Sequence, residues 1–383
     1  MYNLNQAYSF SFPASIRFGV GVIRELPAHL RSQRLKEPLI VTDPTVAELG
    51  FFKKIVEMLK QEGFGVTVFS DISKNPVKSD VIKGGQAFND AECDSIIGIG
   101  GGAALDVARA VALHAYHERD LFDYDDLIGG DKYVTEIIPY FVTVPTTSGT
   151  GSEVGRSAII SEDESKKKRI LFSPRLMAKQ IFADPELTYD LPPAITAATG
   201  MDALTHNMEA FLAKNFHPIC EGIALEGMHL IAKSLEEAVN NPTPISRAKL
   251  MLGSMMGAIA FQKGLGVVHS LAHPLSALLD THHGLANAVN IPYGMRFNYP
   301  GFETQFKRMA RNLELADESG EGVVNWLFEL NTKIGIPHKL SEIGVKEEHI
   351  ETLADLAFAD FCHPNNPKPV TREDFKKLYL EAL

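Results

Sequence analysis

The chain has 383 residues, which is long for one hydrophobic core and sufficient for two domains. Its 37 basic and 48 acidic residues give a net charge of -11, which argues against binding nucleic acid or an anionic membrane surface through bulk charge. A hydrophobic content of 45% is ordinary for a globular protein and excludes a largely disordered chain.

Apolar runs alternate with helical periodicity over the first half of the chain, a pattern typical of a parallel sheet covered by helices. The runs predict strands at residues 38–43, 65–70, 94–100 and 139–145. Helical spacing predicts helices at residues 46–63 and 78–89 and a third that ends near residue 116.

The pattern changes after residue 145. Further strands are expected at residues 154–161 and 169–173, joined by a charged turn, and a last strand at residues 181–185. From residue 191 onward apolar residues recur at helical spacing almost to the end. These patterns predict an α/β domain over residues 1–185 and an all-helical domain over residues 186–383.

The three cysteines, Cys93, Cys220 and Cys362, lie far apart and show no Cys-x-x-Cys spacing. We therefore expect reduced thiols, and neither a disulfide framework nor a thiolate metal site. The first residues lack a basic patch followed by an apolar run, and no apolar stretch reaches membrane-spanning length. These features predict a cytoplasmic protein that does not enter a membrane.

Potential metal ligands are concentrated between residues 202 and 283, which hold seven of the thirteen histidines. Asp202 and His206 are four residues apart, as are His269 and His273, so each pair faces one side of a helix. His283 follows shortly after. A single histidine is more often a hydrogen-bonded core residue than a ligand, but two such pairs close together indicate a metal site. Oxygen and imidazole donors without thiolates suit Fe(II), Zn(II), Mn(II) or Co(II).

A glycine-rich loop follows the predicted strand at residues 94–100 and precedes a predicted helix. Gly100, Gly101 and Gly102 would let the backbone approach a ligand closely, and the N–H groups at the helix start attract an anion such as a pyrophosphate. The match to a dinucleotide fingerprint is loose, because residue 103 is Ala and the loop follows a middle strand. The alternative is a turn that only packs tightly.

Two further features suggest a nucleotide. The loop at residues 145–153 is rich in hydroxyls and glycines, and could bond phosphate or ribose oxygens or only form a turn bonded to itself. Asp43 ends an early predicted strand, where a carboxylate can accept hydrogen bonds from ribose hydroxyls and repel a 2′-phosphate. This position favours NAD over NADP.

With these motifs in place, the chain resembles the iron-containing (group III) alcohol dehydrogenase family nearly from end to end. The resemblance is carried by the three glycines followed by Asp106, and by four further segments at residues 145–153, 198–206, 266–274 and 283–288. It implies a Rossmann-like nucleotide-binding domain, an all-α second domain in a dehydroquinate synthase-like architecture, and an active site in the cleft between them.

The resemblance also implies roles for individual residues. The family's metal ligands fall on Asp202, His206, His269 and His283, with iron as the expected ion and zinc as the alternative. His273 matches a histidine treated as catalytic. The nicotinamide cofactor positions fall on the following residues: Asp43, Asn75, Pro76, Gly100, Gly101, Gly102, Thr146, Thr147, Thr150 and Lys168.

The implied reaction is hydride transfer between NAD and a small primary alcohol or its aldehyde, by a homodimer or higher homo-oligomer. A glycerol, polyol or hydroxy acid dehydrogenase and a dehydroquinate synthase-like lyase are the alternatives, together with a non-catalytic metal- or nucleotide-binding subunit. The lyase is disfavoured because no Lys or Arg lies between His269 and His283 to hold a substrate phosphate. Ala103 and Arg109 depart from residues common in the family, and neither removes a ligand. His282 also departs, and is either an exposed neighbour of His283 or shapes the substrate pocket or proton path.

Overall fold

The computed structural model describes residue 12 and residues 15–383. They form two compact units. The α/β unit contains residues 15–147 and 152–189, and the helical unit contains residues 148–151 and 190–383 together with residue 12. Part of the hydroxyl-rich loop after residue 145 therefore belongs to the helical unit.

A six-stranded parallel sheet forms the α/β unit, in the order β1-β8-β5-β4-β2-β3. The strands are β1 (Ser15–Phe18), β2 (Pro38–Val41), β3 (Thr67–Phe69), β4 (Ser95–Gly100), β5 (Tyr140–Pro145) and β8 (Gln180–Ala183). A separate antiparallel hairpin pairs β6 (Ser157–Ser161) with β7 (Lys168–Phe172). The predicted α/β class is confirmed. Strand β1 was not predicted, because this short edge strand is mostly exposed and carries no apolar run.

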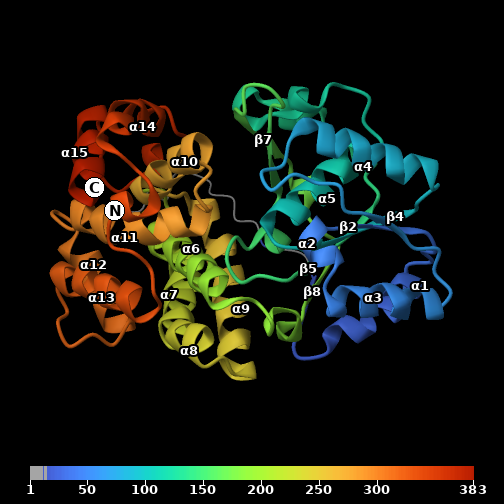
Figure 1. Cartoon of the computed structure of the whole chain (residues 1–383), viewed down its shortest axis with the longest axis horizontal. Coiled ribbons are helices and arrows are strands. Elements are labelled where there is room, and N and C mark those ends of the chain that lie inside the picture. The colour runs from blue at the N-terminus through green and yellow to red at the C-terminus, as the bar shows by residue number, and fades with distance from the viewer. Residues whose placement is uncertain (1–11, 13–14) are drawn as a thin grey trace, which may run out of the picture. The chain divides into compact units, whose positions relative to one another are not determined.

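Helices cover both faces of this sheet, with α1 and α3 on one side and α4 and α5 on the other (Figure 1). Their bounds are α1 (Leu26–Ser32), α2 (Pro44–Ala47), α3 (Gly50–Gln61), α4 (Lys78–Asp90) and α5 (Gly102–His114). Because both faces are covered, β2 and β4 are buried at every position, which explains their uninterrupted apolar sequence.

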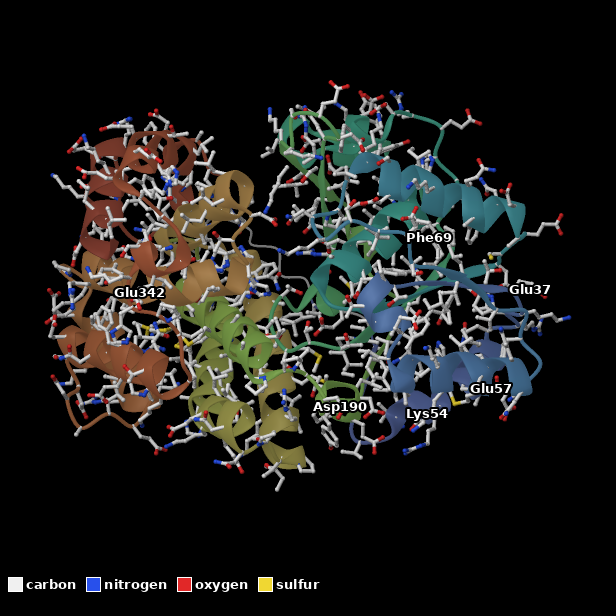
Figure 2. All side chains as sticks on the ribbon, in the orientation of Figure 1. Glu37, Lys54, Glu57, Phe69, Asp190 and Glu342 are labelled. Atoms are coloured by element: carbon white, nitrogen blue, oxygen red, sulfur yellow. The ribbon has the colours of Figure 1, made fainter. Side chains whose placement is uncertain are left out.

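Helix α3 illustrates how the covering helices are patterned. Phe52, Ile55 and Leu59 point into the core at helical spacing, and they pack there with residues of β2, β4 and β5. Lys54 and Glu57 remain exposed on the outer face of the same helix (Figure 2). The alternation at a period of 3.6 residues is what allowed this helix to be predicted.

The helical unit is built around α6 (Pro193–Leu212), which is buried over most of its length. It packs against α7 (Pro218–Ala232), α9 (Pro244–Ala260) and α11 (His283–Asn298). The other helices are α8 (Leu235–Asn240), α10 (Val267–Leu279), α12 (Glu303–Asn312), α13 (Gly320–Lys333), α14 (Ile350–Phe358) and α15 (Arg372–Ala382). A helix buried on all sides belongs to the core of its domain. Helix α6 is therefore the central helix against which α7, α9 and α11 pack.

Among the described residues, no single helix is long and apolar enough to cross a membrane. One pair of segments, Pro244–Lys263 and Val267–Leu279, meets the length and composition criteria only when taken together, and is bent by 107°.

Arg109 on α5 ties the start of the β6–β7 hairpin to the sheet. Its guanidinium is fully buried and donates to Asp106 Oδ1 at 3.2 Å, Ser152 Oγ at 3.0 Å, the Ser157 carbonyl at 2.8 Å, the Leu176 carbonyl at 3.2 Å and the Ser152 carbonyl. The planar guanidinium fork has five N–H donors and can serve five acceptors, whereas a lysine ammonium has only three. These hydrogen bonds explain in structural terms why an arginine occupies position 109.

Replacing this arginine by lysine tests the network. We expect Arg109→Lys to lower the free energy of unfolding by about 2–4 kcal/mol, because buried acceptors lose their donors. Urea unfolding followed by circular dichroism measures the change. Arg17→Lys, at an exposed pair with Glu25, is the matched control and should change stability by less than about 0.5 kcal/mol. Equal stabilities of the two variants would contradict a role for the fork.

Candidate active site

Four side chains from three helices of the helical unit converge around one carboxylate oxygen. Asp202 and His206 lie on α6, His269 on α10, and His283 is the first residue of α11. Asp202 Oδ1 lies 3.9 Å from Nε2 of His206, 3.8 Å from Nε2 of His269 and 3.4 Å from Nε2 of His283. The structure therefore brings together all four residues that the resemblance assigns to the metal.

Local geometry explains the convergence. The i, i+4 spacing on α6 places Asp202 and His206 on one face of that helix. Helix α11 approaches α6 very closely at Gly284, where a Cβ would lie 2.3 Å from the carbonyl oxygen of Ala198. No side chain fits in that contact, so the glycine allows His283 to reach Asp202.

The electrostatics of the cluster match those of metal ligands. Burial favours the neutral form of Asp202, but the charges of the neighbouring histidines and a hydrogen bond from His283 outweigh it and hold the pKa of this carboxyl well below its usual range. Burial, followed by the charges of neighbouring histidines, lowers the pKa of His269 well below its usual value, and burial also lowers the pKa of His206. The low pKa of Asp202 favours its ionised form, and the low pKa values of His206 and His269 favour their neutral forms, which are the forms of these groups that bind cations.

The donor set fits a divalent cation. Asp202 is 2% exposed, and none of the described Lys or Arg side chains forms an ion pair with it. The Asn287 amide nitrogen also donates to Asp202 Oδ1, at 2.7 Å, and lies 3.1 Å from Nε2 of His283 and 3.3 Å from Nε2 of His269. A buried carboxylate needs a positive partner. A cation among these four donors supplies one.

Two carboxylates that the sequence analysis missed hold the outer nitrogens of the α10 histidines. Glu209 Oε2 lies 2.6 Å from Nδ1 of His269, and Asp360 Oδ2 lies 2.7 Å from Nδ1 of His273. Glu209 was detectable, because it follows Asp202 by seven residues on the same face of α6. Asp360 lies far from His273 in the sequence, and no local pattern connects the two.

His273 lies beside the cluster. Its ring centroid is 5.3 Å from that of His283 and 5.9 Å from that of His269. Burial opposes ionisation of Asp360, but the charge and the hydrogen bond of His273 lower the pKa of this carboxyl to about 2. His273 therefore has a persistent anionic partner on Nδ1.

The candidate nucleotide residues of the α/β unit collect at the carboxyl ends of adjacent parallel strands. Asp43 follows β2, Gly100 ends β4, and Thr146 follows β5, with its N–H donating to the Gly100 carbonyl at 3.0 Å. Gly100 has φ +152°, and a Cβ there would lie 2.6 Å from Cβ of Ala104. This edge is where open α/β sheets bind ligands.

Gly101 and Gly102 form the start of α5, and Gly101 is its N-cap without a side-chain hydrogen bond to the helix. The side chain of Thr147 packs at Gly101, where a Cβ would come within 3.3 Å of it. Backbone N–H groups at an uncapped helix start suit a pyrophosphate. The residues therefore fit a dinucleotide. Asp43 already accepts from the N–H groups of Thr45 and Val46, both at 2.9 Å, as the N-cap of α2.

Four further candidates lie around the β6–β7 hairpin or outside the α/β unit: Asn75, Pro76, Lys168 and Thr150. The Pro76 carbonyl, next to Asn75, accepts from the Ser161 N–H at 2.8 Å, and Ser161 pairs with Lys168 across the hairpin. These residues are therefore neighbours. Thr150 belongs to residues 148–151 of the helical unit, where the Gly149 carbonyl accepts from Ser254 Oγ of α9 at 3.1 Å.

Comparisons with known proteins agree along both units. Residues 13–185 match the family described as iron-containing alcohol dehydrogenase, and residues 196–383 match the C-terminal part of the Fe-containing alcohol dehydrogenase family. A 4-hydroxybutyrate dehydrogenase of Cupriavidus necator is 35% identical, over 96% of this chain and 98% of that protein. An NAD-dependent methanol dehydrogenase of Bacillus methanolicus is 32% identical, over 98% and 100%. The crystal structure of a 1,3-propanediol oxidoreductase has a TM-score of 0.94 at 31% identity, covering 99% of this chain and all of that one.

Glu153, at the end of the hydroxyl-rich loop, gives the α/β unit a pH-dependent stability. Burial raises its pKa to about 7, against weaker opposing effects of its own backbone N–H and of Arg109. The folded protein therefore binds a proton that the unfolded chain has released between about pH 4.5 and pH 7. The stabilising effect is complete below this window and lost as the pH rises through it.

We expect the free energy of unfolding to fall between about pH 5 and pH 8, by roughly 3 kcal/mol at most from Glu153 alone. Glu153→Gln cannot ionise, so its decline should be shallower. Urea unfolding of both proteins across this pH range measures the difference. Parallel pH profiles would show that Glu153 is ionised in the folded protein throughout.

Proposed function

The chain belongs to the iron-containing alcohol dehydrogenase family, and we propose that it transfers a hydride between NAD and a small primary alcohol or its aldehyde. The observation that carries the proposal is the convergence of Asp202 with three imidazoles in the helical unit. The glycine-rich edge of the parallel sheet supplies the second requirement, a dinucleotide site. Family membership makes the protein an oxidoreductase.

In this proposal Asp202, His206, His269 and His283 hold a divalent ion, Fe(II) or alternatively Zn(II). Imidazole and carboxylate donors suit both ions, and their relative supply decides between them. When bound, such an ion acts as a Lewis acid that lowers the pKa of a substrate hydroxyl or polarises an aldehyde carbonyl. The described cysteines are all buried and none forms a disulfide, which supports a reducing, cytoplasmic environment.

His273 is the proposed proton carrier. Its Nδ1 is paired with the Asp360 carboxylate, so with one proton held on Nδ1 the second proton is taken up and released at Nε2. The anionic partner stabilises the imidazolium form during that step. His282 stands at the N-cap of α11 and has no role in this scheme.

The nicotinamide cofactor is assigned to the α/β unit. Gly100, Gly101 and Gly102 would receive the pyrophosphate at the start of α5, and Thr146 and Thr147 lie beside them. Asp43 would receive the ribose hydroxyls. Asn75, Pro76, Thr150 and Lys168 are proposed as further contacts.

A hydroxy acid dehydrogenase is a second candidate, because one relative with 35% identity is a 4-hydroxybutyrate dehydrogenase. Such a substrate carries a carboxylate that needs a cationic or N–H partner, whereas a simple alcohol does not. The substrates to be compared are therefore short aldehydes, diols and 4-carbon hydroxy acids of similar length.

The principal test is removal of the metal. With NADH and a panel of short aldehydes, we expect turnover that falls at least about 100-fold after chelation, and that returns on adding Fe(II), Zn(II) or Co(II). NADH absorbance and elemental analysis of the dialysed protein measure both effects. Asp202→Ala should lose bound metal and rate, without rescue by added ions.

The matched control is His229→Ala. His229 bonds the Asn312 carbonyl away from the cluster, so this variant should keep both metal and rate. The proposal fails if Asp202→Ala retains bound metal and full rate. It also fails if no carbonyl compound is reduced by protein that carries metal and is supplied with NADH.

Asp43 provides a test of cofactor choice. Asp43→Ser keeps a side-chain cap for α2 but removes the negative charge, so we expect KM for NADP to fall at least about tenfold while KM for NAD rises. Steady-state kinetics with both cofactors measure the shift. Asp90→Ser, at the end of α4 just before β4, is the control for the loss of one acidic charge. An unchanged ratio of the two KM values in Asp43→Ser would exclude the assignment.

A further inference from the structure

Glu209 is a buried acid that neither the spacing argument nor the family resemblance assigned. It lies on α6, three residues after His206 and seven after Asp202, so all three share one face of the helix. Its side chain is 1% exposed. A carboxyl group with so little access to water must be held by specific hydrogen bonds.

Those bonds all lead to the first turn of α10. Glu209 Oε1 accepts from the Val268 N–H at 2.7 Å, and Oε2 accepts from the His269 N–H at 3.3 Å and lies 2.6 Å from Nδ1 of the same residue. Gly266, the N-cap of α10, makes no side-chain capping bond. Glu209 therefore acts from another helix as the cap of α10, and holds the backbone and the ring of His269 together.

The bond to Nδ1 determines the tautomer of His269. In its ionised form Glu209 accepts and cannot donate, so in that form the imidazole proton lies on Nδ1, and Nε2 keeps the lone pair that faces Asp202. The other two histidines of the cluster lack this partner: among the described residues, no carboxylate is paired with Nδ1 of His206 or Nδ1 of His283. Of the three cluster histidines, only His269 has a carboxylate of the described residues paired with its Nδ1.

We propose that Glu209 is a positioning residue for the metal site: it fixes the tautomer and orientation of His269, and its negative charge adds to that of Asp202 in matching a divalent cation. This inference rests on the metal site of the proposed function. One carboxylate and three neutral imidazoles leave a divalent ion with a net charge of about +1, and a second carboxylate brings the sum to about zero. Outer carboxylates of this type strengthen metal binding by raising the basicity of the ligand.

Glu209→Gln separates this role from that of a helix cap. The amide oxygen can still accept from Val268, but the NH₂ group then faces Nδ1 of His269, which favours the proton on Nε2 and blocks the ligand nitrogen. If the amide is rotated by 180°, its oxygen accepts from Nδ1 of His269 again, but its NH₂ group then faces the backbone N–H of Val268, which is also a donor. Either orientation weakens the metal site, while the fold keeps most of its bonds.

Asp360→Asn is the matched control, because the histidine that Asp360 contacts lies on the same helix, α10, as His269. Asp360 makes the same kind of bond to Nδ1, at 2.7 Å, but to His273, which is not one of the four proposed ligands. The two variants thus change a similar hydrogen bond on two histidines one helical turn apart. Only the first of them concerns a proposed ligand.

The experiment measures Zn(II) affinity of the full chain by competition with a chromophoric chelator, and the absorption spectrum of the Co(II)-loaded protein. We expect Glu209→Gln to weaken Zn(II) binding about 10- to 100-fold and to alter the Co(II) spectrum, and Asp360→Asn to change the affinity less than about threefold. Thermal unfolding of the metal-free proteins checks that both variants fold.

The outcomes are distinguishable. If the wild-type chain binds neither Zn(II) nor Co(II), the proposed function fails and this inference fails with it. If the wild type binds both ions but Glu209→Gln has wild-type affinity and spectrum, only this inference is overturned and Glu209 is a helix cap. Equal weakening by Glu209→Gln and Asp360→Asn would likewise overturn it, because the effect would not depend on which histidine is held.

Discussion

A buried carboxylate surrounded by three imidazole nitrogens is the constraint on which the helical unit depends. Asp202 has lost its water shell, and no described lysine or arginine replaces it. Its charge is stable only with a cation, so the packing of three helices must deliver the donors of that cation to one point. The buried helix α6 carries Asp202 and His206, and the close contact of α11 at Gly284 brings His283 to them.

Two similar histidines on α10 have different acidic partners and different proposed roles. His269 and His273 are one turn apart, and each bonds a buried acid through Nδ1. The acid behind His269 comes from α6, the helix that also carries two of the proposed ligands, whereas the acid behind His273 comes from the segment after α14. The partners therefore distinguish the two imidazoles, although local sequence makes them equivalent.

In the α/β unit, a buried arginine holds the loops beside the candidate nucleotide site in place. Its loops at the carboxyl edge of the sheet must hold a defined shape while keeping backbone N–H groups free for a ligand. The buried fork of Arg109 bonds backbone carbonyls and side chains of the segments that follow β5 and β7, so the scaffold beside the glycines is held from within. Hydrogen bonds from an always-charged group suit this purpose.

Local spacing in the sequence was sufficient to predict five of the six strands of the sheet, the covering helices α3, α4 and α5, and the pairing of Asp202 with His206, because these depend on periods of two and 3.6 residues. The resemblance to a family supplied the grouping with His269 and His283. Edge strand β1 was missed, since its exposed side chains show no apolar pattern. Glu209 could have been found from its place on the face of α6.

The partners of the α10 histidines, the amide of Asn287 beside the cluster and the assignment of residues 148–151 to the helical unit were decided by tertiary structure alone. Such contacts join residues far apart in the chain, and no periodic pattern records which of many buried acids or amides will meet a given ring. The sequence by itself determined which donors are available, and the packing of α6, α10 and α11 decided which of them face one another.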